Sequence, residues 1–367
     1  MQKSYRLFYL FLTLLLGSTL ASCESLFEEE GDCTPKYRIT FEYTKNLKWA
    51  DAFANEVSSV NLYIFDSEGI FVKQYDAAGP ELAQPGFAIE FDGNEIKPGD
   101  YTMVAWCGLV NDGESMQSFT VPQPVAGQTK LEELICTLNT IEASQLKSRA
   151  EGDAEPEYSE ADLNFLFHGM IEATLEDNHD GRTQELKISL TKDTNHITVI
   201  LQQLDEGEDM IANNYDFSIV SADGRLAYNN DLLPYNPVVT YLPWSRVPLQ
   251  MESLDNGGPE INQGVMADIT TSRIMASEQS SYLLTIKDNQ DNDKVLATIP
   301  VISYALLGKS YIESHYNHNQ PMTNQEFLDR MDEYTLTLFL RGDRWVGLQV
   351  QILEWREVTF FEDIVTH

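Results

Sequence analysis

The chain has 367 residues, and its 58 acidic side chains outnumber its 24 basic ones to give a net charge of −34. With 43% hydrophobic residues, a chain of this length can build the cores of two domains, which argues against global disorder. The negative charge repels phosphate backbones and anionic lipid surfaces, so nucleic-acid binding is disfavoured and any membrane attachment must be covalent or inserted.

Residues 1–22 have the pattern of an export signal. Lys3 and Arg6 precede an apolar run over residues 7–16, which is too short to span a bilayer. The sequence Leu-Ala-Ser-Cys at residues 20–23 then resembles the lipobox of bacterial lipoproteins, in which the signal is cut before a cysteine that carries lipid. We expect a lipoprotein signal peptide over 1–22 and lipidation of Cys23; the alternative is a plain signal peptide followed by a chance cysteine.

Residues 23–35 form an acidic tether in this interpretation. Glu24 and the cluster Glu28–Glu30 follow the lipidated cysteine directly. An acidic run at this place resembles the surface-export signal of some outer-membrane lipoproteins, and it equally suits a solvated spacer whose self-repulsion extends it from the membrane.

Three further cysteines remain for an exported protein, namely Cys33, Cys107 and Cys136. They allow one disulfide and one free thiol. We expect Cys107 to pair with Cys136, because both lie in strand-like segments of the same half; Cys33 with Cys107 is the alternative. No Cys or His spacing suggests a zinc site.

Alternating apolar residues predict strands through the first half. Residues 36–44 (KYRITFEYT) place every second side chain on one apolar face, and residues 60–65 and 70–75 flank a turn and predict a hairpin. Residues 101–107 (YTMVAWC) predict a buried strand. Phe53 is expected to dock a short turn or helix on the first hairpin. Short strands at this spacing favour an all-β, antiparallel sandwich architecture.

The acidic segment 141–162 contains almost no large apolar side chains and predicts a loop within the first domain. A strand pattern returns over 165–175, and residues 176–182 (EDNHDGR) predict a turn. We therefore place an N-terminal β-sandwich domain at 36–182 and a C-terminal β-sandwich domain at 183–367.

The second half repeats this organisation. Residues 282–286 pair with 295–299, and 335–340 with 345–355, in two predicted hairpins. One helix is predicted over 324–333, with Thr323 as its N-cap. The last segment, 345–361, is a strand candidate that could be donated to a partner or complete its own sheet.

Candidate catalytic and metal-binding residues are few, and we predict no catalytic site, metal or cofactor. His315 and His318 have a spacing usable for a metal but lack a third ligand. Residues 288–293 offer oxygen atoms for calcium, yet they lack the glycine and terminal glutamate of an EF-hand loop, so a turn is favoured. Arg341-Gly342-Asp343 is known from integrin ligands, and here a turn between strands explains it.

Three aromatic residues lie among prolines in the second half: Tyr235, Tyr241 and Trp244. They could stack on sugars, or they could hold a proline-rich loop in place, which is the interpretation we favour.

Several short motifs together resemble one family. They are Leu-Tyr-Ile-Phe-Asp at 62–66, Pro-Gly-Asp-Tyr at 98–101, Val-Ala-Trp at 104–106, Leu-Phe-His-Gly at 166–169 and Ile-Leu-Glu-Trp at 352–355. With the lipobox, their order resembles the FimB-type fimbrial anchor and assembly lipoproteins, from Cys23 to about residue 358. The resemblance implies two tandem transthyretin-like β-sandwich domains on an outer-membrane lipid anchor, and no enzymatic activity.

The resemblance thus predicts a surface lipoprotein of the outer membrane that anchors or assembles a fimbrium. Its partners would be fimbrial subunits, bound by β-strand complementation at an open sheet edge. A surface glycan-binding lipoprotein and a tip or shaft subunit of the fimbrium are the alternatives. A surface hydrolase would need a convergent catalytic cluster, which the sequence does not indicate.

Overall fold

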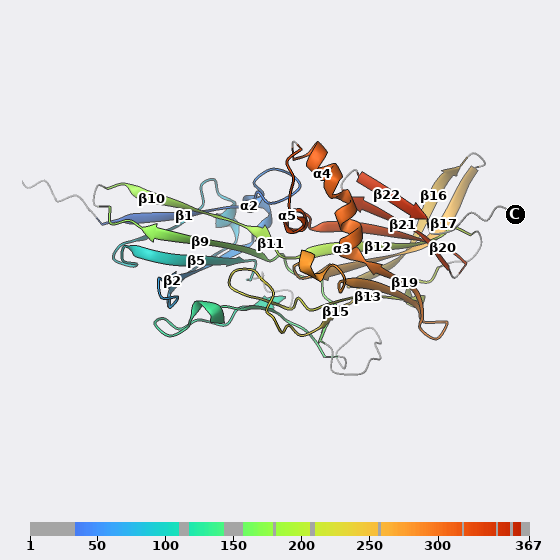
Figure 1. Cartoon of the computed structure of the whole chain (residues 1–367), viewed down its shortest axis with the longest axis horizontal. Coiled ribbons are helices and arrows are strands. Elements are labelled where there is room, and N and C mark those ends of the chain that lie inside the picture. The colour runs from blue at the N-terminus through green and yellow to red at the C-terminus, as the bar shows by residue number, and fades with distance from the viewer. Residues whose placement is uncertain are drawn as a thin grey trace, which may run out of the picture.

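The computed structural model describes residues 34–109, 117–142, 157–178, 181–205, 210–255, 258–317, 319–342, 344–352 and 355–360. It consists mainly of β-strands arranged in several sheets, in which most neighbouring strands are antiparallel (Figure 1). The all-β prediction is therefore confirmed, whereas the transthyretin-like topology stays a prediction.

Two sheets build the N-terminal half, with strand orders β10-β1-β4 and β11-β9-β5-β2-β3. In chain order the strands are β1 (Lys36–Glu42), β2 (Ser59–Asp66), β3 (Phe71–Ala78), β4 (Ile89–Asp92), β5 (Gly99–Cys107), β9 (Phe167–Leu175), β10 (Thr183–Ser189) and β11 (Thr191–Lys192). β2 and β3 form the predicted hairpin, which confirms the turn after Asp66.

Strand β2 of the five-stranded N-terminal sheet is buried on both faces, and this explains its sequence. Leu62 and Ile64 of β2 face the three-stranded sheet, where β1 supplies its alternating buried residues. Tyr63 and Phe65 belong to a second apolar cluster on the opposite face. A strand with both faces covered has no solvent side, so β2 reads as a nearly continuous apolar run.

Two larger sheets build the C-terminal half. One has six strands in the order β16-β17-β12-β20-β21-β22, and the other has five in the order β19-β18-β13-β15-β8. The strands are β8 (Glu157–Ser159), β12 (Asn195–Gln203), β13 (Tyr215–Ser221), β15 (Val239–Tyr241), β16 (Ser245–Asp255), β17 (Gly258–Thr271), β18 (Leu283–Asp288), β19 (Lys294–Pro300), β20 (Glu333–Arg341), β21 (Arg344–Ile352) and β22 (Trp355–Phe360). Both predicted hairpins, β18–β19 and β20–β21, are confirmed.

The predicted domain boundary after residue 182 is wrong, because strands from the two sides of this boundary pair with each other in the same sheets. β10, expected to open the second domain, lies parallel to β1 in the first half, and β11 pairs with β9. Conversely, β8 lies within the segment expected to be a loop of the first domain, and it pairs with β15. A small sheet of β6 (Phe119–Thr120), β7 (Cys136–Leu138) and β14 (Arg225–Leu226) also joins the halves.

Short helices lie mostly in one stretch near the C-terminal sheets: α3 (Val301–Ala305), η6 (Leu306–Gly308), α4 (Lys309–His315) and α5 (Asn324–Arg330). The predicted cap of α5 is confirmed, since the Thr323 hydroxyl accepts a 3.0 Å hydrogen bond from the Glu326 amide. The helix ends at Arg330 rather than at 333, where β20 begins. The expectation of a single helix is wrong, because α3 and α4 exist as well.

Within the described residues, four 3₁₀ helices lie outside this stretch: η1 (Pro80–Ala83), η2 (Leu131–Glu133), η4 (Ala212–Asn214) and η5 (Ala276–Glu278). The turn expected around Phe53 is the one-turn helix α2 (Phe53–Glu56). The Phe53 ring stacks on Phe41 of β1 and on Phe87, with ring centroids 5.8 Å apart in both pairs. Phe53 therefore docks this helix as predicted, but against β1 rather than against the hairpin.

The molecule is elongated, with the two halves placed end to end (Figure 1). β1 begins at the left end of this view, whereas β22 lies in the right half and points toward the right end. The long β16–β17 hairpin also extends at the right end. The described chain thus begins at one end of the molecule and runs toward the other.

Candidate functional site: the junction and the distal sheet

The two halves are joined at Lys192, the last residue of β11, which pairs with β9 of the first half. Only Asp193 and Thr194 separate it from β12 of the second half. The Lys192 side chain is only 6% exposed, and its ammonium lies 2.6 Å from Asp332 Oδ2 and 3.3 Å from Glu56 Oε2. Burial alone would raise the pKa of Glu56, but the charges and hydrogen bonds of Lys48 and Lys192 outweigh it and lower this pKa. Lys192 therefore holds carboxylates of both halves together.

A second charged network surrounds Asp193, the residue that follows Lys192. The Arg273 guanidinium donates to both carboxylate oxygens of Asp329, at 2.8 and 3.0 Å, and to the Asn230 carbonyl. The Asn230 amide donates to Asp193 Oδ1 at 2.8 Å, and Arg273 Nε lies 3.6 Å from the same oxygen. Asp193 sits in the link between β11 and β12, so the network fixes that link to the second half.

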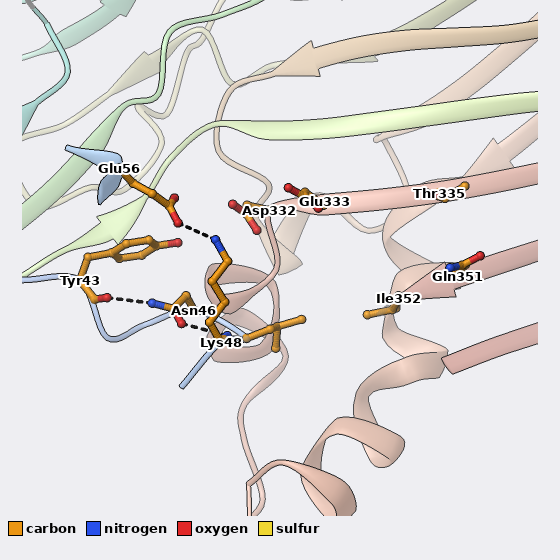
Figure 2. A pocket seen from close by; sticks show the side chains of 10 residues that line it. Tyr43, Asn46, Lys48, Glu56, Asp332, Glu333, Thr335, Gln351 and Ile352 are labelled. Carbon is orange, nitrogen blue, oxygen red and sulfur yellow. Dashed lines mark hydrogen bonds and ion pairs between the residues drawn. The ribbon is translucent and has the colours of Figure 1, made fainter. Parts of the chain in front are cut away.

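A pocket of about 270 Å³ opens beside this junction. Figure 2 shows the side chains of Lys48 and Glu56 from the first half pointing toward each other, next to Asp332 of the second half. The complete lining is Tyr43, Asn46, Leu47, Lys48, Glu56, Asp332, Glu333, Thr335, Gln351 and Ile352. Amides, carboxylates, a hydroxyl and an ammonium group thus surround one cavity, which suits a ligand with many hydrogen-bonding groups.

The open edges of the second half are the other candidate. Among the described residues, β22 is the last strand of the six-stranded sheet and pairs only with β21, and β16 is the strand at the opposite edge. An edge strand carries main-chain N–H and C=O groups that can pair with a strand from another chain. The segment 345–361, expected to be one strand, is instead the two strands β21 and β22 of a hairpin within this sheet.

The predicted disulfide between Cys107 and Cys136 is absent, and both cysteines are buried free thiols. The reason is the alternation of β5. Cys107 faces the cluster between the two N-terminal sheets, whereas Cys136 lies with Trp106 on the opposite face of the same sheet. Cys23 and Cys33 lie outside the described residues.

Of the weaker sequence candidates, the segment 288–293 and the Arg-Gly-Asp motif lie at turns where the structure describes them, whereas His315 is the last residue of α4. Residues 289–293 connect β18 and β19, and Asn292 and Asp293 have φ values of 50° and 54°. Gly342 connects β20 and β21, and its amide donates to Asp205 Oδ2 at 2.6 Å; Asp343 lies outside the described residues. His315 stacks on Tyr311, and His318 also lies outside the described part.

The three aromatic residues among prolines differ in exposure. Tyr241 is fully buried, and its hydroxyl donates to Asp223 Oδ1 at 2.6 Å, so it holds the core. Tyr235 is 93% exposed and Trp244 40% exposed. The aromatic platform considered from the sequence therefore reduces to one partly supported ring, Trp244.

Across the described ranges, no three His, Cys, Asp or Glu side chains group in a way that could hold a metal ion. No described helix has the length and apolar character that crossing a bilayer requires. What these residues do present is an elongated β-structure with an ion-paired junction, a polar pocket and open sheet edges, which suits a structural or adhesive protein.

Comparison with known proteins identifies the family. A family model described as "Fimbrillin-A associated anchor proteins Mfa1 and Mfa2" matches residues 29–359, and the chain belongs to this family. The predicted resemblance to fimbrial anchor proteins is thereby confirmed. The family is one of structural fimbrial anchor proteins, and this chain is a fimbrium-associated surface protein. No curated protein sequence matches the chain.

Solved structures agree with this family. A proposed adhesin from Bacteroides thetaiotaomicron is 27% identical, with a TM-score of 0.69 over 88% of this chain and 97% of that one. A proposed polysaccharide-binding protein from the same species is 23% identical, with a TM-score of 0.68 over 90% and 99%. The fimbrial anchor protein Mfa2 of Porphyromonas gingivalis is 16% identical, with a TM-score of 0.56 over 88% and 99%. The last two show the fold alone.

Sequence reasoning missed the residues of the junction and the pocket. The sequence analysis did not single out Lys192 and Arg273, because their partners Glu56, Asp332 and Asp329 are far away in the sequence. One local signal was available: Lys192-Asp193-Thr194-Asn195 is a polar stretch between two apolar strands, and all four residues are buried. Buried charged residues of this kind require partners.

Proposed function

We propose that this protein is a lipid-anchored lipoprotein of the outer membrane that holds the base of a fimbrium through β-strand complementation with a fimbrial subunit. The observation that carries the proposal is the polarity of the molecule. β1, which follows the segment containing Cys23, begins at one end, and the edge strand β22 points toward the other (Figure 1). A lipid at the first end leaves the second end to face the fibre.

Strand complementation would use the free side of β22. This strand has six residues, and its register with β21 runs from Ile352 opposite Trp355 to Gly347 opposite Phe360. A subunit strand added there would form main-chain hydrogen bonds along the edge and extend the six-stranded sheet. Because β22 already pairs with β21 of its own chain, this pairing supports a role for β22 as the acceptor edge rather than as a strand donated to another subunit.

The lipid anchor is tested by replacing its cysteine. Cys23→Ala should release the protein, with any attached fibres, from washed outer membranes, because several acyl chains are needed for firm anchoring. Cys33→Ala removes a nearby thiol and serves as the matched control, which should stay with the membrane. Retention of the Cys23→Ala protein would contradict the anchor, and recovery of the wild-type protein mainly with sheared fibres would favour a tip or shaft subunit instead.

The acceptor edge is tested with prolines at Glu357 and Val358. Adjacent residues of an edge strand point their N–H groups alternately toward the neighbouring strand and away from it. One substitution should therefore lower the melting temperature by breaking a hydrogen bond to β21. The other should leave that temperature within about 2 °C but abolish binding of the purified fimbrial subunit. Full subunit binding by both variants would exclude this edge.

A further inference from the structure

We propose that the outer face of the six-stranded sheet binds a neutral oligosaccharide along a polar strip that runs from Trp244 to the pocket at the junction. We define the polar strip as Trp244, His196, Asp268, Thr198, Thr335 and Gln351, with Glu333 at the pocket. This inference is independent of the fimbrial role, because it concerns a face of the sheet and not its edges.

Strand register places the polar strip on one face. Thr198 of β12 lies opposite Asp268 of β17 and beside Thr335 of β20, and Thr335 lies opposite Gln351 of β21. Directly paired residues point to the same side of a sheet. The opposite side is the apolar core, to which β12 contributes Ile197 and Val199. Thr335, Gln351 and Glu333 also line the pocket, so strip and pocket are continuous.

The Trp244 end is a supported aromatic platform. Its ring is 40% exposed, and its centroid lies 6.1 Å from that of the His196 ring. The Trp244 amide donates to the Asp268 carbonyl at 3.1 Å, which fixes the backbone beneath the ring. Asp268 Oδ1 accepts from the Thr198 hydroxyl at 2.8 Å and lies 3.2 Å from His196 Nε2. A flat ring beside fixed polar groups matches a sugar, which has one C–H face and a rim of hydroxyls.

The pocket end supplies both hydrogen-bond donors and hydrogen-bond acceptors. Gln351 carries an amide, Thr335 a hydroxyl, Glu333 an exposed carboxylate and Lys48 an ammonium group (Figure 2). The Asn46 amide is buried and already donates to the carbonyls of Tyr43 and Ala50, so it shapes the wall of the pocket. Sugar hydroxyls are donors and acceptors at once and can satisfy such a mixed lining. An anionic glycan is disfavoured, because the chain carries a net charge of −34.

A peptide strand is a poorer occupant of this face. β17, β12, β20 and β21 each have a neighbour on both sides, so their main-chain groups are already paired. Strand addition needs an unpaired edge, and recognition in the middle of a sheet must rely on side chains. The polar strip offers one exposed large ring and otherwise polar groups, which favours a sugar over an apolar peptide.

Native gel electrophoresis of the full protein in gels containing yeast mannan, starch or xylan tests the proposal. We expect at least one of these polysaccharides to retard the protein. Trp244→Ala should weaken that retardation about tenfold in apparent dissociation constant, through loss of ring stacking. Tyr235→Ala removes an even more exposed aromatic ring nearby in the chain and should bind like the wild type.

The Thr335→Val variant tests the other end of the strip if Trp244→Ala fails to fold, and it should also weaken retardation. Absence of retardation by all three polysaccharides overturns the proposal, as does equal binding by Trp244→Ala. If Trp244→Ala binds polysaccharide normally but no longer binds the fimbrial subunit, the strip is a protein interface and the proposal is wrong. Subunit binding by the wild type is measured in the same preparation, so that failure of one function is distinguished from failure of the other.

Discussion

Asp193 is a carboxylate at the junction whose burial disfavours its charged form. Its carboxylate is fully buried, and among the described residues Oδ2 has no hydrogen-bond partner. Burial raises the pKa of Asp193 to about 7, against the opposing influence of Arg273 and the hydrogen bond from Asn230. The folded protein therefore retains a proton that the unfolded chain, with an ordinary pKa of about 3.9, releases.

This difference fixes the sign of a pH effect. The contribution of Asp193 to stability is complete below about pH 4 and is lost as the pH rises toward about 7. Asp193→Asn cannot titrate, so the free energy of unfolding of the wild type should fall by about 3 kcal/mol relative to this variant between about pH 4.5 and pH 7.5. Urea denaturation at the two pH values measures it. Asp291→Asn, at an exposed turn, should track the wild type, and a pH-independent difference for Asp193→Asn would contradict the assignment.

At the scale of elements, the end of β5 is fixed by a close approach to the segment before β9. Gly108 follows β5 with φ of +86°, and a Cβ atom there would lie 1.8 Å from the Phe165 carbonyl oxygen. Gly127 has a similar φ of +73°, but a Cβ atom there would meet nothing within 4 Å. The two glycines share the backbone requirement, and only Gly108 adds a collision with another segment.

Alanine at these two positions separates the two effects. Gly127→Ala should lower the free energy of unfolding by about 1 kcal/mol, which is the effect of a left-handed backbone conformation alone. Gly108→Ala should lower it by at least about 3 kcal/mol, because the collision with backbone forces β5 and β9 to shift. Thermal denaturation of both variants compares them, and equal losses would show that the close approach is not maintained in solution.

The strand pairings also show which parts of the fold could be predicted from the sequence. The hairpins β2–β3, β18–β19 and β20–β21 were predictable, because alternating strands and the turn between them are neighbours in the chain. The parallel pairing of β1 with β10 and of β12 with β20 was not, because each pair joins segments far apart. The pocket was missed for the same reason, since Glu56 and Asp332 meet only after both halves have folded. α3 and α4 were missed because each is too short to establish a helical pattern.

At the scale of the whole molecule, the two halves share one apolar core. The large cluster contains Tyr63 and Trp106 from the first half together with Val239, Ile269 and Leu336 from the second. β7 and β14 pair across the halves as well. Because this core is continuous and the Lys192 ion pairs lie beside it, neither half can unfold without exposing apolar surface of the other.

We therefore expect a single calorimetric transition in which the van't Hoff and calorimetric enthalpies agree. Lys192→Met leaves Glu56 and Asp332 without their shared cation, and breaking a buried pair in this way costs about 3 kcal/mol. The whole transition should then move down by about 5 °C as one peak, since the junction belongs to both halves. Lys187→Met is the matched control: its ion pair with Glu42 involves a lysine that is 61% exposed, and its loss should leave the transition in place. Two separate peaks in the wild-type protein would show instead that the halves unfold independently and that Lys192 connects two autonomous domains.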